Sequence, residues 1–396
     1  MAPQADEFFY RAGGIYDLKS VDLTQAELER YSRQLVLPEI GPTGQMKLKG
    51  SSVIVVGAGG LGIPASVYLA AAGVGRIGIV DGDDIERSNL HRQTIYTEAD
   101  VGQAKAEVAA DRLREVNPHI AIVPHRLRLD SSNALDILGG YDVVVDCTDN
   151  FPARYLINDA CVMLHRPDVY ASIFRFDGQA SVFHADKGPC YRCLFPEPPP
   201  ADTTQDCSEA GVLGVLPGIM GGIQAAQTIN LLVGNGRSLI GRLLLYNARD
   251  MTFSELRVGK SAHCPVCGIH PTVTKLIDYE EFCGTNRALP QVKEVDAITL
   301  KRLLDGGSKI KLVDVREPYE YELCHLPESK LIPLGDLERR VGELSPADEI
   351  VVYCHVGVRS ARAVELLSSH GFARARNLMG GIRAWADSVD PSMPVY

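Results

Sequence analysis

Short apolar runs separated by turns and by helix-like stretches fill the first two thirds of the chain. Residues 52–56 predict a buried strand, a glycine-rich turn follows at 57–62, and a helix is expected through Ala72. Further strands are expected at 76–81 and 142–146. The order strand, turn, helix, strand defines a βαβ unit, and strands without polar positions are typical of a parallel sheet covered on both faces.

The remaining pattern predicts a second, smaller α/β domain. A long proline-rich loop up to about residue 216, a helix over 218–232 and a strand near 243–246 complete the first unit. Strands are expected at 311–315 and 349–353, with a helix over 358–371. The predicted division is an N-terminal extension at 1–25, a first domain at 26–282, a linker at 283–291 and a second domain at 292–396.

Composition narrows the functional classes. The chain of 396 residues has a formal net charge of −10, which does not indicate binding to nucleic acid. No apolar run approaches the ~18 residues that a membrane span needs, and the N-terminus lacks the pattern of a secretory signal. We therefore expect a cytoplasmic protein, in which cysteines serve as metal ligands or reactive thiols more often than as disulfides.

The turn that follows the first strand has the spacing of a phosphate-binding loop. Gly57, Gly59 and Gly62 form a Gly-x-Gly-x-x-Gly pattern between a strand and a helix. Glycines let the backbone approach a phosphate, and the helix N-terminus offers free N–H groups. Asp81 ends the next strand, where a carboxylate can accept hydrogen bonds from ribose hydroxyls. By itself this pattern fits NAD or FAD as well as ATP.

Further charged residues favour ATP. Arg92 follows the second strand closely and Lys105 comes about one helix later, so two cations can neutralise a triphosphate. Asp149 follows the third strand, at the edge of the sheet where ligands gather, and a carboxylate there suits Mg²⁺. Each of these residues alone also fits an ordinary surface position.

Together these motifs resemble the MoeB/ThiF family, relatives of ubiquitin-activating enzymes, over residues 26–280. The resemblance implies a Rossmann-type mixed sheet, homodimers, and adenylation of a carboxylate by ATP with Mg²⁺. It implies that Arg33 reaches the phosphates of the neighbouring subunit and that Asp149 holds Mg²⁺. His91 and Gln227 depart from the residues usual in the family. The residues expected to bind the nucleotide are Gly57, Gly59, Gly60, Gly62, Asp81, Ser88, Asn89, Arg92, Gln93, Lys105, Asp149 and Asn150.

Four cysteines form two Cys-x-x-Cys pairs, which is the usual thiolate set of a tetrahedral structural Zn²⁺ site. Redox disulfides and free thiols are the competing interpretations. A closed site of four sulfurs leaves no open coordination position, so we expect no catalytic role. The predicted ligands are Cys190, Cys193, Cys264 and Cys267.

The other cysteines differ in their surroundings. Cys207 lies at the end of the proline-rich loop, and in the family a cysteine of this loop can bond covalently to the carrier protein. An unreactive loop cysteine is the alternative. The cysteines without a surrounding motif, expected to be packing residues, are Cys147, Cys161, Cys283 and Cys324.

A loop that begins with Cys354 and ends at Arg359 lies between a predicted strand and a predicted helix. Backbone N–H groups of such a loop stabilise an anion on sulfur, which suits a thiolate nucleophile and its persulfide. The loop encloses four residues, one fewer than the Cys-x₅-Arg loops that hold phosphate. Cys354 and Arg359 are therefore candidate catalytic residues.

The segment 292–396 resembles the rhodanese family. The resemblance rests on the active loop, on residues 313–317, 325–327 and 380–385, and implies sulfur transfer through Cys354. We interpret Asp314 and Arg316 as a structural salt bridge and Trp385 as a core residue.

The fusion of the two domains resembles the MoeZ-type proteins. It implies that the first domain adenylates the C-terminal Gly-Gly tail of a ubiquitin-like sulfur-carrier protein. The second domain would then supply sulfur from a persulfide on Cys354, loaded by a cysteine desulfurase or by thiosulfate. Two alternatives remain: an NAD-dependent oxidoreductase, and a persulfide-binding adaptor whose adenylation site is inactive.

Overall fold

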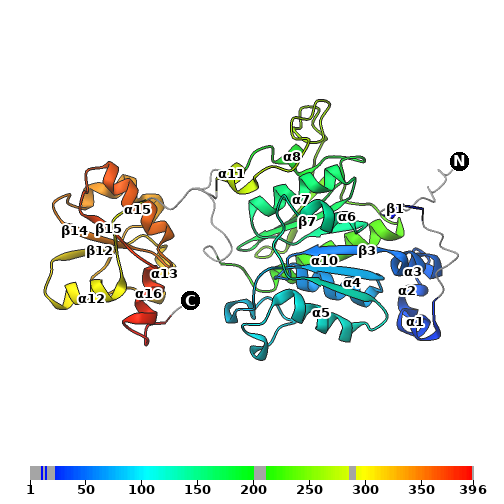
Figure 1. The fold of residues 1–396 in the computed structure, drawn as a ribbon, viewed down its shortest axis with the longest axis horizontal. Helices are drawn as coiled ribbons and strands as arrows, with labels where there is room; N and C mark the ends of the chain where they lie inside the picture. The colour runs from blue at the N-terminus through cyan, green and yellow to red at the C-terminus, as the bar shows by residue number, and fades with distance from the viewer. Residues whose placement is uncertain (1–9, 12–13, 16–22, 200–210, 285–290, 395–396) are drawn as a thin grey trace. The chain divides into compact units, whose positions relative to one another are not determined.

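The computed structural model describes residues 10–11, 14–15, 23–199, 211–284 and 291–394 (Figure 1). The chain divides into two compact units, Met1–Thr285 and Asn286–Tyr396, each built around its own sheet. Among the described residues, no helix is both long enough and apolar enough to cross a membrane.

The first unit contains an eight-stranded sheet in the order β10-β9-β8-β7-β6-β3-β4-β5. The five strands from β7 to β5 run parallel, and β8, β9 and β10 continue the sheet antiparallel. The parallel strands are β3 (Ser52–Val56), β4 (Arg76–Val80), β5 (Ala121–His125), β6 (Val143–Asp146) and β7 (Asp168–Phe174). The others are β8 (Asp177–Phe183), β9 (Arg242–Asn247) and β10 (Thr252–Arg257).

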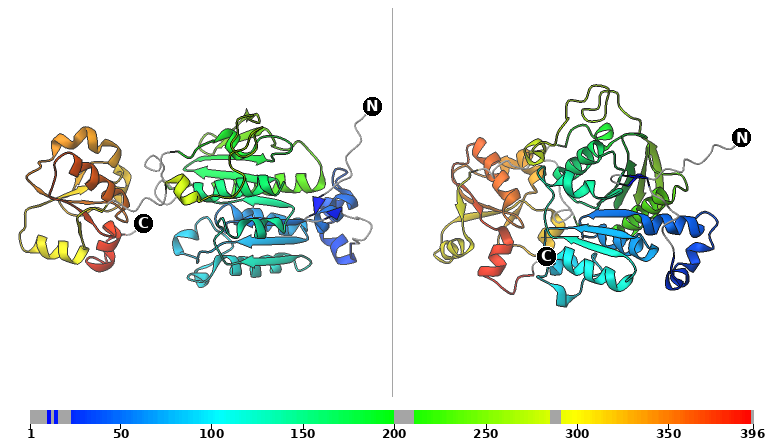
Figure 2. Two further views of the ribbon diagram at one scale, coloured as in Figure 1. Left: turned by 45° about the horizontal axis from the view of Figure 1, so that its top comes forward. Right: turned by 45° about the vertical axis from the view of Figure 1, so that its right-hand side comes forward.

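Helices cover both faces of this sheet, as the apolar strands predict (Figure 1; Figure 2). Side chains of β3 alternate between the faces: Val53 and Val55 pack in one core, and Ile54 and Val56 pack in the other. The first core includes side chains of α4 (Gly62–Ala72), α5 (Lys105–Val116) and α10 (Leu216–Val233). The second includes side chains of α6 (Ala134–Gly139), α7 (Phe151–Met163) and α11 (Tyr279–Cys283).

Smaller elements complete the first unit. A two-stranded antiparallel pair, β1 (Tyr10–Arg11) with β2 (Gly14–Ile15), precedes the helices. The short helices are α1 (Gln25–Arg30), α2 (Ser32–Leu35), α3 (Gly41–Gly50) and α8 (Tyr191–Leu194), and the 3₁₀ turns are η2 (Arg87–Asn89) and η3 (Glu98–Asp100).

The second unit is built on a five-stranded parallel sheet in the order β11-β15-β14-β12-β13. Its central strand β14 (Glu349–Tyr353) repeats the alternation of β3, with Ile350 and Val352 in one core and Val351 and Tyr353 in the other. The remaining strands are β11 (Glu294–Val295), β12 (Ile310–Asp314), β13 (Lys330–Leu331) and β15 (Ala375–Leu378). The helices are α12 (Ala297–Asp305), α13 (Pro318–Leu323), α14 (Leu334–Arg340), α15 (Val358–Ser369) and α16 (Gly381–Ser388), with the 3₁₀ turn η4 (Val341–Glu343).

Most predicted elements are present, and the differences have local causes. The helix predicted from residue 218 begins at Leu216, because Pro217 fits in a first helical turn, where no N–H partner is lost. Strand β5 contains Pro124 and His125 and was not predicted from its mixed composition. Cys283, where the predicted linker begins, is buried as the last residue of α11.

A substitution of Gly62, at the start of α4, tests whether the fold requires glycine at this position. A Cβ atom on Gly62 would lie 1.7 Å from the Gly57 carbonyl oxygen, so Gly62→Ala must move the backbone. We expect a loss of about 2 kcal/mol or more in the free energy of unfolding of the first unit. Calorimetry of the full chain measures it.

Gly222→Ala in α10 is the matched control, since a Cβ there meets no heavy atom within 4 Å. Alanine is the better helix former, so this variant should be as stable as the parent or more stable. Equal stability of the two variants would contradict the close approach at Gly62.

Candidate functional site

The glycine turn lies between the end of β3 and the start of α4, and at Gly57 and Gly62 the backbone packing leaves no room for a side chain. Gly57 has a φ of +98°, and a Cβ atom there would lie 2.8 Å from the Cys147 carbonyl oxygen. Gly59 and Gly60 face the residues after β4: a Cβ on Gly59 would lie 3.6 Å from Gln93 Nε2. The turn is therefore held close to β6 on one side and to the η2 region on the other.

Asp81, directly after β4, fixes this turn. Its Oδ2 accepts a hydrogen bond from the Ala58 N–H at 2.8 Å, and its Oδ1 accepts one from the Asp83 N–H at 2.8 Å. Burial raises the pKa of Asp81, while these N–H groups and the charge of Lys105 oppose the rise. A carboxylate at this strand end is suited to ribose hydroxyls.

Lys105 is the first residue of α5 and is largely buried. Its Nζ lies 3.4 Å from Asp83 Oδ2, and Arg128 binds the other oxygen of Asp83 at 2.8 Å. Burial opposes the change, but Arg128 and Lys105 lower the pKa of Asp83 below its ordinary value. The ammonium group of Lys105 is thereby placed beside the carboxylates that follow β4.

Arg92 is held by its own turn. Its Nη1 donates to the Ser88 carbonyl oxygen at 2.9 Å and lies 2.8 Å from His91 Nε2. Because a guanidinium only donates, His91 Nε2 is the acceptor and its ring is neutral. Burial, followed by the charge of Arg92, lowers the pKa of His91. Asn89 closes the same turn by accepting from the Glu86 N–H at 3.3 Å.

Gln93 is buried, yet its Oε1 has no hydrogen-bond partner within the described part of the chain. Leaving a buried amide oxygen unpaired costs about 1–3 kcal/mol, so such a group needs an explanation. Gln93 lies next to the glycine turn. A bound ligand at this turn would provide a partner.

The loop after β6 presents one exposed carboxylate. Asp146 is buried and accepts from the Thr148 N–H at 2.9 Å and the Thr148 hydroxyl at 2.6 Å. Asn150 caps α7 by accepting from the Ala153 N–H at 3.0 Å. Asp149 lies between these fixed residues and is exposed. Since β6 pairs with β3, this carboxylate and the glycine turn lie at the same edge of the sheet.

The structure thus brings most of the predicted nucleotide residues to one sheet edge, where β3, β4 and β6 end. It adds two residues that the sequence did not indicate. The Tyr96 hydroxyl lies 2.9 Å from the Ala58 carbonyl oxygen and 3.2 Å from that of Lys105, which joins the turn to α5. Arg154 Nη2 donates to the Thr148 carbonyl oxygen at 3.2 Å. A lone tyrosine and a helical arginine give no sequence signal.

Two predicted residues are not brought to this edge. Arg33 is exposed on α2 and makes no hydrogen bond or ion pair with the candidate residues that the structure describes. Cys207 lies outside the described residues.

The four predicted metal ligands converge. Their sulfur atoms all lie within 4.8 Å of one another, with separations of 3.4 Å for Cys193–Cys267, 3.5 Å for Cys190–Cys264 and 3.9 Å for Cys190–Cys193. Tetrahedral Zn²⁺ with Zn–S bonds of about 2.3 Å requires sulfur separations of about 3.8 Å. The set fits Zn²⁺ as a closed structural site.

A buried ion pair supports α8, the short helix that begins after Cys190 and contains Cys193. Arg192 forms a bidentate pair with Asp159 of α7, at 2.9 Å from Nε and 2.8 Å from Nη2. The Tyr279 hydroxyl donates to the same carboxylate at 2.8 Å. The chain segments at α7, α8 and α11 are thus joined next to the four cysteines.

In the second unit, the loop after β14 surrounds Cys354. Its buried Sγ accepts a hydrogen bond from the Gly357 N–H at 3.1 Å, and the Ser360 hydroxyl lies 3.4 Å away. Gly357 has a φ of +95°, and a Cβ on Gly381 would lie 2.4 Å from the Cys354 carbonyl oxygen. The close glycine packing places one backbone N–H, that of Gly357, at the sulfur, where it can stabilise a thiolate.

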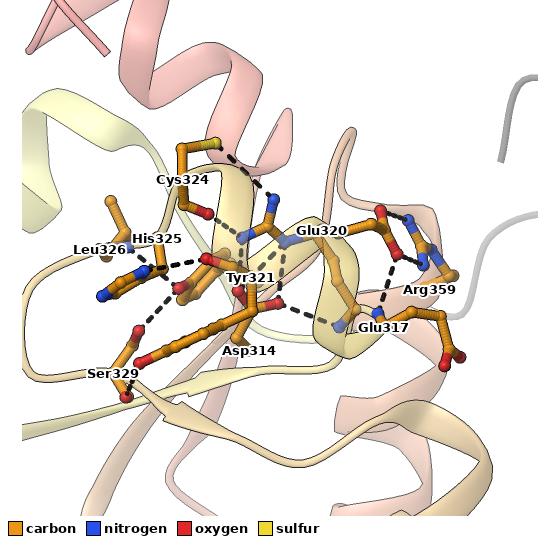
Figure 3. Close-up of polar contacts among 11 residues, drawn as sticks. Asp314, Glu317, Glu320, Tyr321, Cys324, His325, Leu326, Ser329 and Arg359 are labelled. Carbon is orange, nitrogen blue, oxygen red and sulfur yellow. Dashed lines mark hydrogen bonds and ion pairs between the residues drawn. The ribbon is translucent and has the colours of Figure 1, made fainter. Parts of the chain in front are cut away.

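The second unit contains two buried arginine–carboxylate pairs, and Figure 3 shows the pair that Arg359 forms with Glu320. Arg359 pairs with Glu320 of α13 through both terminal nitrogens, each at 2.7 Å. Arg316 pairs with Asp314, with Nη2 at 2.6 Å from Oδ2, and both side chains are fully buried. The structural salt bridge predicted for Asp314 and Arg316 is confirmed, and Trp385 is in the core as predicted.

The comparison with known families accounts for both units. Residues 31–266 match the ThiF family, and residues 296–388 match the rhodanese-like domain. The chain belongs to the ThiF family and carries a C-terminal rhodanese-like domain.

The chain is similar to curated relatives over almost their whole length. The chain is 44% identical over 393 residues to "Adenylyltransferase and sulfurtransferase MOCS3" of Aedes aegypti, covering 94% of this chain and 90% of the relative. It is 45% identical over 403 residues to the protein of the same name from Sus scrofa, with coverage of 94% and 89%.

Among solved structures, the chain is similar to E. coli MccB crystallised with ATP. The TM-score is 0.55 at 25% identity, covering 62% of this chain and 75% of that one. The structure of MccB with MccA-N7isoASN gives a TM-score of 0.56 at 25% identity, with coverage of 60% and 74%.

The metal site is tested by Cys264→Ser. We expect loss of bound zinc, seen by elemental analysis, and a decrease of at least about 3 kcal/mol in the unfolding free energy of the first unit, because metal binding contributes to folding. Cys324→Ser, in the second unit, should retain one zinc per chain. Full zinc content in Cys264→Ser would contradict the assignment of this ligand.

The contact between His91 and Arg92 predicts a pH dependence. The His91 pKa is lowered, so neutral His91 accepts from Arg92 at neutral pH, and the contact is lost as pH falls through that pKa. Protonated His91 would repel Arg92. We expect the KM for ATP to rise on acidification, measured as initial rates against pH.

His91→Gln keeps an acceptor that does not titrate. Its KM for ATP should therefore rise less steeply on the acid side. If the KM for ATP rises equally in the two proteins as the pH falls, His91 does not govern the position of Arg92.

Proposed function

We propose that this chain adenylates the C-terminal carboxylate of a ubiquitin-like sulfur-carrier protein with ATP and then converts it to a thiocarboxylate. The observation that supports this most directly is that a single chain contains both candidate sites. The candidate nucleotide site lies at the sheet edge where β3, β4 and β6 end, and the cysteine loop follows β14. The names of the relatives, adenylyltransferase and sulfurtransferase, describe the same pair of activities.

In the first step the carrier carboxylate attacks the α-phosphorus of ATP, and pyrophosphate leaves. We assign the phosphate contacts to the N–H groups of the glycine turn, Arg92 and Lys105, and the ribose contact to Asp81. Asp149, exposed at the same edge, would hold Mg²⁺, which neutralises phosphate charge when bound. Ser88, Asn89 and Asn150 shape the surrounding turns, and Gln93 offers its unpaired amide oxygen.

We also propose that the enzyme is a homodimer in which Arg33 reaches the phosphates bound by the partner. Arg33 is exposed, and the residues that follow on its helix and turn, Val36 and Leu37, expose large apolar side chains. Exposed apolar groups of this kind are typical of subunit interfaces. Reduced thiols at the zinc site and on Cys354 suit a cytoplasmic location.

In the second step a persulfide on Cys354 attacks the carbonyl of the acyl-adenylate, and AMP leaves. The product is an acyl disulfide between the carrier and Cys354. A thiol then attacks the Cys354 sulfur, which releases the carrier thiocarboxylate and leaves a disulfide on the enzyme. Cys207 is our candidate for this thiol or for a covalent intermediate with the carrier, and an external reductant regenerates the enzyme.

The two alternatives make different predictions. A nicotinamide oxidoreductase has no use for Lys105, Arg92 and Asp149 at one edge. A persulfide-binding adaptor with an inactive adenylation site would not cleave ATP between its α and β phosphorus atoms.

The proposal is tested by ATP–pyrophosphate exchange with carrier proteins that end in Gly-Gly. Lys105→Ala and Asp149→Ala should each reduce exchange by about a hundredfold or more, the usual effect of removing a preorganised electrostatic contact. Lys187→Ala, which removes an exposed lysine of the same unit, is the control and should leave exchange unchanged.

Cys354→Ala separates the two steps. It should keep exchange, while intact-mass analysis of the carrier should show no replacement of oxygen by sulfur. Exchange that never occurs with any such carrier would contradict adenylation, and normal sulfur incorporation in Cys354→Ala would contradict the second step.

A further inference from the structure

The only arginine of the loop that holds Cys354 is already bound to a carboxylate. Arg359 gives both terminal nitrogens to the two oxygens of Glu320, at 2.7 Å each (Figure 3). The side chains are 8% and 2% exposed. A bidentate pair that is shielded from water is strong and geometrically fixed.

Glu320 is held in this position by its own helix. Its Oε2 also accepts a hydrogen bond from the Glu317 N–H at 2.8 Å, which completes a capping box at the start of α13. The carboxylate therefore cannot turn away from Arg359 without leaving a helix N–H unpaired. The positive charge of Arg359 is neutralised in place.

Two exposed apolar side chains lie at the loop. Val356, within the loop, is 43% exposed, and Met379 is 52% exposed. They are neighbours in space, because a Cβ on Gly357 would lie 3.1 Å from the Gly380 nitrogen. Burial lowers the pKa of His355, which keeps this loop residue neutral at neutral pH. Arg383, on α16, is a second cation beside the loop: its backbone N–H donates to the His355 carbonyl oxygen at 3.1 Å, and its charge also lowers the pKa of His355. Its side chain is exposed, where solvent screens the charge, and every variant described below retains it.

Two kinds of donor place different charges at this loop. When the Cys354 thiolate attacks the outer sulfur of thiosulfate, the S–S bond breaks and sulfite leaves with two negative charges. When it attacks the terminal sulfur of a persulfide R–S–SH, the S–S bond breaks and R–S⁻ leaves with one charge, or as R–SH after protonation. In both cases the transferred sulfur remains on Cys354. Only the first route needs a local cation for a departing dianion.

We propose that Glu320 is a specificity-determining residue: by occupying Arg359 it disfavours dianionic donors such as thiosulfate and favours a persulfide donor. This inference deepens the proposed function and depends on sulfur transfer through Cys354. Glu320 acts through Arg359 and not by contact with the sulfur.

The test is a gain of function in the full chain. Glu320→Gln preserves shape and removes the charge, so Arg359 becomes available to an anion. We expect the KM for thiosulfate to fall by about tenfold, the value of one charge-assisted hydrogen bond. The rate with a cysteine desulfurase supplied with L-cysteine should not rise in parallel. Loading of Cys354 is measured by intact mass in each case.

Two variants serve as controls. Glu322→Gln removes the same charge from the exposed side of the same helix and should leave the KM for thiosulfate unchanged. The double variant Glu320→Gln/Arg359→Gln should lose the gain, because the gain depends on the guanidinium. Loss of folding lowers activity with every donor and cannot produce a lower KM for one of them.

The outcomes distinguish this inference from the proposed function. If Glu320→Gln is loaded by thiosulfate with the parent's KM, or if Glu322→Gln gives the same gain, the role of Glu320 is wrong while sulfur transfer stands. Should Glu320→Gln fail to fold, Glu320→Asp, which shortens the carboxylate and loosens the pair, must lower the KM in part. If no donor loads Cys354 in the parent protein, the proposed sulfur transfer itself fails.

Discussion

The candidate site of the first unit depends on one constraint: the backbone of the glycine turn packs directly against neighbouring backbone. Gly62 leaves no room for a Cβ atom against the Gly57 carbonyl, and Gly57 itself lies against the carbonyl of Cys147 after β6. These approaches bring three strand ends into one short edge, so that residues far apart in the sequence face a common ligand. Asp81 then fixes the turn by accepting the Ala58 N–H. Because the glycines keep the backbone compact, space remains at this sheet edge for a ligand to reach the charged side chains.

The same close backbone packing recurs in the second unit, where it surrounds a cysteine sulfur. Gly381 packs against the carbonyl oxygens of Cys354 and His355, and the N–H of Gly357 points to the sulfur. In both units a parallel strand buried on both faces ends in a glycine-dependent loop before a helix. The two loops differ in charge: lysine and arginine side chains gather at the first, whereas the arginine of the second is neutralised by Glu320. This difference matches a polyphosphate at one site and a sulfur atom at the other.

Much of this arrangement could be predicted from the sequence, for physical reasons. The strands β3, β4, β6 and β14 have one polar residue each, and β12 has two, so their apolar runs are easy to recognise in the sequence. The convergence of the four cysteines could be predicted from their spacing, since two Cys-x-x-Cys pairs are the usual thiolate set of a metal site. Antiparallel strands such as β10, whose residues are all exposed, gave no such signal. The pairing of Arg359 with Glu320 could not be predicted, because it joins residues 39 positions apart through geometry that only the folded α13 and α15 provide. Tyr96 and Arg154 were missed because neither a lone tyrosine nor an arginine within a helix stands out in the sequence.

The zinc ligands have a consequence for how the chain acquires its fold during synthesis. The two pairs are separated by 74 residues, so the metal can be enclosed only after residue 267 has left the ribosome. Strand β3 can pair with β4 and β6 long before then, because all three strands precede the first cysteine pair in the sequence. Domains form as their segments emerge, and late contacts close them. A metal that binds these four cysteines would therefore act on a nearly finished unit, and its shortage would leave chains with a formed β3–β6 sheet but an open C-terminal side.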